Sequence, residues 1–127
     1  NPLACSTVMG CLQTAFCSKV VYMMEVPDWA HRREHIEGRS RRKGEREQDI
    51  LVPWANEAYA DPQAATFDPD YASTSGISVR TIGWSDQAGF LITVITVRDD
   101  DGHLWGATAF RANNIDEYHY LNAWEEA

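Results

Sequence analysis

An arginine and a glutamate near the end of the chain are the side chains best suited to phosphate ester chemistry. Arg111 ends a strand-like stretch at residues 103–111, and Glu117 follows in a helix-like stretch. A guanidinium can hold a phosphate and stabilise a pentacoordinate transition state, while a carboxylate can accept the proton of a 2′-hydroxyl. The alternative is a structural salt bridge, in which Glu117 completes a helix-capping box begun by Asn114.

Two further basic residues are candidates for catalysis. Arg80 alternates with Ile82 and Trp84 along a strand-like stretch, so it shares a face that is otherwise apolar. It either lines a cleft or reaches the edge of the sheet. Lys43 belongs to an exposed basic connection, where contact with a phosphate is plausible but catalysis requires additional positioning.

A possible metal motif lies before these basic residues. His31, Glu34 and His35 fit the spacing H-x-x-E-H, in which two histidines bind zinc and the glutamate acts as base. A zinc hydrolase also needs a third ligand, and the sequence offers no clear candidate. The alternative is a pair of surface histidines on a basic helix, so we expect neither a metal nor another cofactor.

Positive charge is concentrated in residues 32–46, although the chain carries a net charge of -8. Seven of the eleven Lys and Arg residues fall in this basic window, whose net charge of +4 leaves -12 for the rest of the chain. A basic stripe on an acidic body can steer a polyanion such as RNA to one place, or it can pair with an acidic protein. A solvated helix and loop without a partner is the alternative.

Length and composition predict a single folded domain. The chain has 127 residues, of which 44% are hydrophobic and 11% aromatic, enough for a core without disulfides or metal. Cys5, Cys11 and Cys17 form no C-x-x-C pair, so we expect reduced thiols in a cytoplasmic protein. Polar residues interrupt residues 1–23 too often for a membrane span, so we expect a peripheral extension there and the folded domain at residues 24–127.

Helix signals occur in three places. Residues 28–37 carry a helical pattern, followed by an exposed connection at residues 39–44. Pro53 suits the first turn of a second helix, which we expect to run to Ala60. Asn114 is expected to cap the last helix.

Strand signals dominate the middle of the chain. Stretches rich in β-branched and aromatic residues occur at 19–26, 64–67, 77–85, 90–98 and 103–111. The fourth of these is apolar on both faces, so we expect it at the centre of the sheet. In the fifth, strict alternation would place Trp105, Ala109 and Arg111 on one face. The order of elements predicts an α+β domain with N-terminal helices, a central antiparallel sheet of three to four strands and a C-terminal helix.

A series of landmarks runs from Trp29 to Glu117. Between them lie Lys43-Gly44, Glu57-Ala58-Tyr59-Ala60-Asp61-Pro62, Asp68-Pro69-Asp70, Ile82-Gly83-Trp84-Ser85, an apolar strand from Leu91 to Val97, and Ala109-Phe110-Arg111. In their order and spacing, over about four fifths of the chain, they resemble the BrnT-like toxins. These are small ribonucleases of the RelE/ParE superfamily of bacterial toxin-antitoxin systems.

The resemblance implies a RelE-like sheet packed by helices. It also implies a type II toxin that cleaves RNA without a metal and so inhibits translation. The implied partner is a cognate antitoxin that also binds DNA, in a dimer or a toxin-antitoxin heterotetramer. No membrane association is expected.

The resemblance also suggests which residues act. Arg111, Glu117 and Lys43 map onto the family's catalytic positions, and Arg80 maps less closely, because the family's basic residue on that strand lies nearer its start, at Ser78. We expect RNA or the antitoxin to be bound by Trp29, Arg32, Arg33, Arg39, Arg41 and Arg42. This basic surface should lie apart from a catalytic centre located across the sheet, near Arg111.

The chain departs from that family in its charge. Such toxins are generally basic, whereas this chain is acidic, and its last helix lacks the Lys and Arg residues that normally follow the strand. Both departures weaken RNA affinity, because phosphate neutralisation supplies most nonspecific binding. A second hypothesis is therefore a catalytically degenerate homologue, a module whose basic window binds an acidic antitoxin or another protein.

Overall fold

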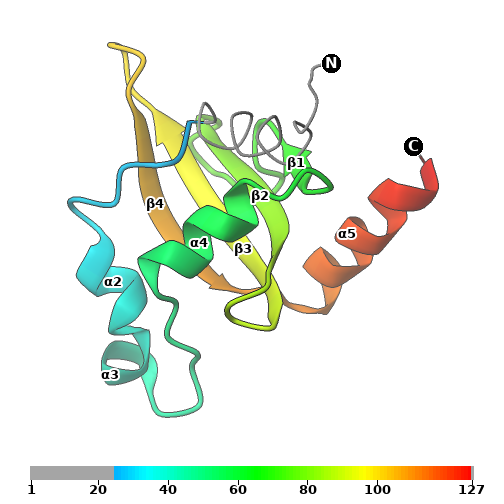
Figure 1. Cartoon of the computed structure of the whole chain (residues 1–127). Coiled ribbons are helices and arrows are strands. Elements are labelled where there is room, and N and C mark those ends of the chain that lie inside the picture. The colour runs from blue at the N-terminus through cyan, green and yellow to red at the C-terminus, as the bar shows by residue number, and fades with distance from the viewer. Residues whose placement is uncertain (1–24, 127) are drawn as a thin grey trace, which may run out of the picture.

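The computed structural model describes residues 25–126, with side chains up to residue 123. Two short helices, α2 (Arg33–Glu37) and α3 (Arg39–Lys43), are followed by α4 (Val52–Tyr59). Next come four strands, and then a final helix: β1 (Ala65–Phe67), β2 (Ser78–Ser85), β3 (Phe90–Arg98), β4 (Leu104–Arg111) and α5 (Asn114–Glu126). This arrangement confirms the expected α+β domain, with helices before and after a central sheet (Figure 1).

The expected N-terminal extension at residues 1–23 and its three cysteines lie outside the described residues. Most of the strand expected at residues 19–26 also lies outside them, and the two residues of it that are described, Glu25 and Val26, form no strand. Within the described part, no helix combines the length and the apolar character needed to cross a membrane.

The strands form one antiparallel sheet in the order β1-β2-β3-β4, so each pairs with its neighbour in sequence. β3 lies between β2 and β4, as its apolar pattern on both faces predicts. The two turns that flank β3 contain Gly89 and Gly102, with φ angles of 80° and 85°. Glycine adopts this region without steric cost, which permits the tight reversals.

α4 covers one face of the sheet, over β2 and β3 (Figure 1). Ala55 and Ala58 of this helix are fully buried together with Ile92 and Val94 of β3. Gly83 on β2 allows the close approach, because an added Cβ atom would lie 1.9 Å from the carbonyl oxygen of Ala58. A side chain at this position would therefore push the helix away from the sheet.

The residues before α2 run along the β4 edge of the sheet. Two backbone hydrogen bonds of 2.9 Å join Asp28 to this strand. Trp29 packs on Gly106, where an added Cβ atom would lie 2.5 Å from the indole ring. Trp29 is only 4% exposed, and its Nε1–H donates to Asn56 Oδ1 at 2.8 Å. This predicted binding residue is therefore part of the core.

α5 packs on the opposite face of the sheet. Successive side chains on a strand point to opposite faces of the sheet. Gly83 faces α4, so Ile82, the residue before it, points to the face on which α5 packs. A second buried cluster here consists of Ala65, Ile82, Ala112 and Tyr120. Tyr120 Oη donates to Asp61 Oδ2 at 2.7 Å, which ties α5 to the segment that follows α4.

The region before α4 differs from the sequence-based expectations. The first helix begins at Arg33 rather than Asp28, because the Asp28 carboxylate accepts the Ala30 N–H at 2.9 Å and shapes a turn. The expected connection after that helix is in fact α3. Ser40 joins it to Asp49 through two hydrogen bonds of 2.6 and 3.0 Å, so its basic residues sit on a helix fixed to the loop that follows.

The cap of α5 also differs from the expectation. Asn113, not Asn114, caps this helix, because its side-chain Oδ1 accepts the backbone N–H of Asp116 at 2.8 Å. Asp116 thus occupies the position three residues after the cap, where Glu117 was expected. The predicted capping box between Asn114 and Glu117 is therefore wrong.

A bulge changes which side chains of β4 share a face. The pairing with β3 shifts between Ile95 and Thr96, which adds one residue to β4 at that point. Trp105 therefore points away from the face shared by Ala109 and Arg111, contrary to the strict alternation expected. Arg111 lies on the face that α4 covers.

Candidate functional site

Three arginines converge on one small pocket at the end of β4. The pocket has a volume of about 260 Å³ and is lined by Arg39, Arg46, Glu47, Gln48, Phe110, Arg111 and Ala112. Two of the three arginines come from the basic window, and the third is the predicted catalytic residue of β4. The expectation that the window lies apart from Arg111 is therefore wrong for Arg39 and Arg46, because α3 and the loop after it fold against the end of β4.

Arg39 is fixed in this pocket by two neighbours. Its side chain is 14% exposed, and its guanidinium carbon lies 5.5 Å from the centre of the Phe110 ring. Its Nε donates to Glu47 Oε1 at 3.0 Å. Because the aromatic ring and the carboxylate already order this guanidinium, less conformational entropy is lost when it binds an anion.

Arg111 is exposed, and aromatic side chains on the α4 face orient it. Its guanidinium carbon lies 4.5 Å from the centre of the Phe90 ring. Phe90 in turn meets Trp54 edge to face, with 6.2 Å between the ring centroids. Among the described residues, no acceptor binds the guanidinium N–H groups of Arg111.

The charges around the pocket favour an anion. Three guanidiniums and the Glu47 carboxylate give the lining a net charge of +2. Arginine binds phosphate oxygens through pairs of N–H groups in a fixed geometry. Negative charge grows on the phosphorus oxygens as a phosphodiester reacts, so a pocket of this charge can both bind the ester and stabilise its transition state.

Two predicted catalytic residues do not line this pocket. Lys43 is exposed at the end of α3, and Glu117 is half-buried in the first turn of α5. Between Arg111 and Glu117, both within the described residues, there is no hydrogen bond or ion pair. A role for Lys43 or Glu117 therefore depends on a substrate that reaches beyond the pocket.

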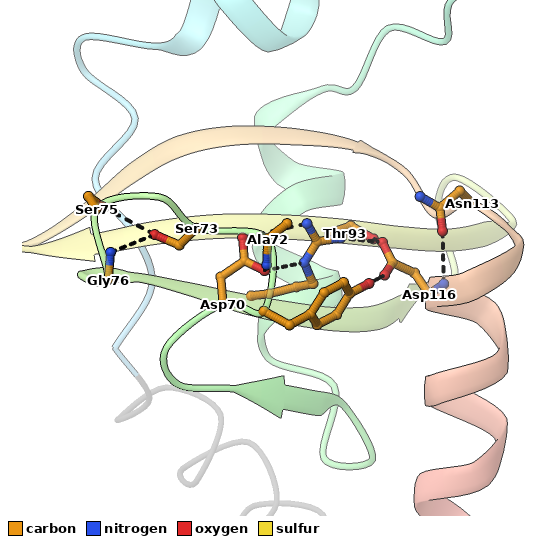
Figure 2. Close-up of polar contacts among 10 residues, drawn as sticks. Asp70, Ala72, Ser73, Ser75, Gly76, Thr93, Asn113 and Asp116 are labelled. Atoms are coloured by element: carbon orange, nitrogen blue, oxygen red, sulfur yellow. Dashed lines mark hydrogen bonds and ion pairs between the residues drawn. The ribbon is translucent and has the colours of Figure 1, made fainter.

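Arg80 belongs to a different place, a buried network beside the first turn of α5. Figure 2 shows Asp70, Thr93 and Asp116 of this network. The Nε of Arg80 donates to Asp70 Oδ1 and its Nη1 to Asp116 Oδ2, each at 2.7 Å. The Thr93 hydroxyl also donates to Asp116 Oδ2 at 2.7 Å, and the Tyr71 hydroxyl donates to the other oxygen of the same carboxylate. The network thus joins the loop before β2, both central strands and α5.

The two carboxylates of this network keep the Arg80 guanidinium charged and bound. Burial alone would lower the pKa of Arg80, but the hydrogen bond to Asp70 and the charges of Asp116 and Asp70 outweigh it and raise this pKa. Burial and then the hydrogen bond to Asp116 raise the pKa of Tyr71 to about 12. Two carboxylates already bind the single guanidinium, so contact with a phosphate would require at least one of these pairs to open.

The other predicted binding residues lie on the surface of α2 and α3. The exposed ones are Arg32, Arg33, Arg41 and Arg42. Arg33 pairs with Glu37 one turn later at 3.2 Å, and Arg42 Nη2 donates to the carbonyl oxygen of His35 at 2.8 Å. Burial and the surrounding positive charges, that of Arg42 first, lower the pKa of His35. Burial is the larger cause of this shift, and the nearby arginines of α2 and α3 add to it.

The H-x-x-E-H residues form no metal site in the described part of the chain. His31 stacks on Trp105 with 4.9 Å between ring centroids, while His35 lies half-buried beside Arg42. Among the described residues, no group of three or more His, Cys, Asp and Glu side chains could hold a metal ion. The described residues therefore supply no third ligand for the zinc site that the sequence suggested.

Sequence reasoning did not identify several residues of these two clusters. Glu47 lies in a loop whose sequence has no periodic pattern, so nothing in the local sequence indicates that its side chain pairs with Arg39. Asp70 and Asp116 are far apart in sequence, and the Arg80 guanidinium binds both of them. One signal was available, because Arg80 on an otherwise apolar strand face requires a buried carboxylate partner.

Comparison with known proteins identifies no relative of this chain. No protein-family model matches the chain, and no curated protein or solved structure matches it. The fold and the pocket define an α+β domain with an arginine-lined pocket at the end of β4. The likeness to BrnT-like toxins rests on the sequence landmarks.

Proposed function

We propose that this protein is the toxin of a type II toxin-antitoxin pair, a metal-independent endoribonuclease that cleaves RNA and so inhibits translation. The observation that supports the proposal is the convergence of Arg39, Arg46 and Arg111 on one pocket. Phosphate is the group that several guanidiniums in so small a space recognise best. The landmarks shared with BrnT-like toxins favour RNA as the carrier of that phosphate.

Each part of the basic surface has its own role in this proposal. Arg111 stabilises the charge that develops on the phosphorus oxygens, and Arg39 and Arg46 hold the phosphate in place. The exposed arginines of α2 and α3 bind the RNA backbone farther along the strand. A cognate DNA-binding antitoxin neutralises the toxin in the bacterial cytoplasm, in a dimer or a heterotetramer.

Expression in bacteria and assays with purified protein test this function. We expect growth to stop, cellular transcripts to be cleaved, and a synthetic single-stranded RNA to be cut in the presence of EDTA. Arg111→Ala should lower the cleavage rate by about 100-fold or more, the usual effect of removing a transition-state donor, without changing the circular dichroism spectrum.

Arg98→Ala is the matched control for the Arg111 variant. Arg98 is also exposed, pairs with Glu25 and lies at the opposite end of the sheet, so its loss should leave cleavage unchanged. Normal growth and intact transcripts in cells that contain the folded wild-type protein would contradict the proposal.

A second candidate function is a protein-binding module that lacks catalysis. It is favoured by Arg80, a predicted catalytic residue whose guanidinium is bound by Asp70 and Asp116. In this function the exposed cations of α2 and α3 bind an acidic antitoxin. Salt-sensitive binding to the product of the neighbouring gene, lost on combining Arg41→Glu with Arg42→Glu and without any RNA cleavage, would select this candidate.

A further inference from the structure

We infer that Glu47 is the general base of the arginine-lined pocket, the group that accepts the proton of the attacking 2′-hydroxyl. This inference rests on the proposed ribonuclease function and deepens it. The sequence had suggested Glu117 for this role. Glu47 is the carboxylate found among the described residues that line the pocket with Arg39, Arg46 and Arg111.

The position of Glu47 suits a base. One of its oxygens, Oε1, accepts the Nε–H of Arg39 at 3.0 Å, which anchors the carboxylate beside the phosphate-binding donors. The second oxygen, Oε2, makes no hydrogen bond within the described part of the chain, and the side chain is 42% exposed. An anchored carboxylate with one open oxygen is the arrangement that proton transfer requires.

Other glutamates near the basic helices lack this arrangement. Glu37 uses both oxygens, since Oε1 accepts from Arg33 at 3.2 Å and Oε2 accepts the Val52 N–H at 2.9 Å. Glu45 is exposed in the same loop as Glu47 but does not line the pocket. Glu45 is therefore a natural control.

The chemical step follows from this placement. Glu47 Oε2 accepts the proton of the 2′-hydroxyl while the 2′-oxygen attacks phosphorus. The bond between phosphorus and the 5′-oxygen breaks, and that oxygen takes a proton from the Glu47 carboxylic acid, directly or through a water. The products are a 2′,3′-cyclic phosphate and a 5′-hydroxyl, and Glu47 returns to its ionised form.

This chemistry defines the substrate class. The nucleophile belongs to the substrate, so the pocket cleaves RNA and leaves DNA intact. A single 2′-deoxy nucleotide on the 3′-oxygen side of the scissile phosphate should block cleavage and still permit binding, because the three arginines contact the phosphate and do not need the hydroxyl.

The test compares Glu47→Gln with Glu45→Gln and the wild-type protein. Glutamine keeps an oxygen that can accept the Arg39 hydrogen bond but cannot act as a base. We expect Glu47→Gln to lower the cleavage rate of a synthetic single-stranded RNA by about 100-fold or more, the usual contribution of a general base. Its affinity for the same RNA with 2′-O-methyl groups should be equal or higher, and Glu45→Gln should match the wild type in both assays.

A second variant separates a base from a structural residue. Glu47→Ala should be inactive, and added formate should restore part of its activity, because a small carboxylate can occupy the space left by the side chain. A structural role for Glu47 would give no formate rescue.

The outcomes distinguish this inference from the function on which it rests. If the wild type cleaves RNA and Glu47→Gln cleaves it within about threefold of the same rate, then Glu47 is not the base and the ribonuclease function stands. An inactive Glu47→Ala variant that formate does not rescue, although it still binds RNA, also overturns the inference. If the folded wild type cleaves no RNA, the proposed function itself fails.

Discussion

The Arg80 guanidinium and the Asp116 carboxylate meet at 2.7 Å beneath α5, with side chains that are 9% and 0% exposed. The pair fastens the first turn of α5 to the central strands. Ala112, which lies just before that helix, lines the arginine pocket. The buried pair therefore helps to fix the chain between Arg111 and α5, which includes Ala112 of the pocket. Arg80, which the sequence suggested for catalysis, thus has a positioning role.

Removal of this carboxylate should destabilise the whole domain. In Asp116→Ala, Arg80 loses a charged partner, while Thr93 and Tyr71 lose their shared acceptor. Breaking a buried ion pair in this way costs about 3 to 5 kcal/mol, so we expect a much lower midpoint of urea unfolding. Asp101→Ala, in an exposed turn, should change the stability by less than about 0.5 kcal/mol. Equal midpoints for the two variants would show that the pair adds no stability.

The sheet could be predicted from sequence because its signals are local. The run from Phe90 to Arg98 is apolar on both faces, and this pattern alone indicates a central strand. Turn residues such as Gly89 and Gly102 separate it from its neighbours. Local patterns could not reveal the bulge near Thr96, because a bulge depends on how two strands are aligned.

The pocket was only partly predictable, for a similar reason. Charge segregation identified the basic window, and the place of Arg111 at the end of a strand-like stretch, together with the resemblance, identified that residue. Their meeting depends on Arg39 packing over Phe110 and on Asp49 holding Ser40. Both are tertiary contacts, and no periodic pattern in the sequence indicates them. The sequence could therefore name the cations but could not show which of them share a site.

The contact between α4 and the sheet gives a second prediction. Gly83→Ala would place a Cβ atom 1.9 Å from the carbonyl oxygen of Ala58, and backbone cannot move aside as a flexible side chain can. We expect a loss of about 3 kcal/mol or more in the free energy of unfolding, at or above the usual cost of overpacking. Thr66→Ala on the exposed face of β1 is the control. Thermal unfolding of both variants measures the difference, and a stable Gly83→Ala protein would mean that α4 is not seated as described.

The exposed arginines of α2 and α3 give a third prediction, about salt. Each phosphate contact on a single strand changes the logarithm of the binding constant by about 0.7 per tenfold change in salt. The double variant Arg41→Gln with Arg42→Gln should therefore reduce this slope by about 1.4 if both residues bind the RNA backbone. Fluorescence anisotropy with a 2′-O-methyl RNA at several salt concentrations measures the slope. An unchanged slope would place the RNA elsewhere.

His35 provides a fourth prediction, about pH and stability. Burial and the charge of Arg42 lower its pKa below the ordinary value of 6.5, so in the window below pH 6.5 the unfolded chain binds more protons than the folded one. Stability contributed by the neutral imidazole is thus present above pH 6.5 and is lost as the pH falls through the lowered pKa. His35→Asn should reduce this acid-side loss, which urea unfolding at pH 7 and pH 5 can measure.

The same imidazole should report the binding of a polyanion. Burial lowers the pKa of His35 most, and the charges of Arg42 and its basic neighbours lower it further. RNA docked on α2 and α3 neutralises those charges, so this pKa should rise on addition of a 2′-O-methyl RNA and fall back when salt displaces the RNA. NMR titration of the ring proton of His35 measures the change. In Arg42→Gln the free protein should start from a higher pKa, since the strongest of these charges is absent, and RNA should raise it less. If RNA binds with unchanged affinity for both proteins and leaves this pKa where it was, the docking site does not include α2 and α3.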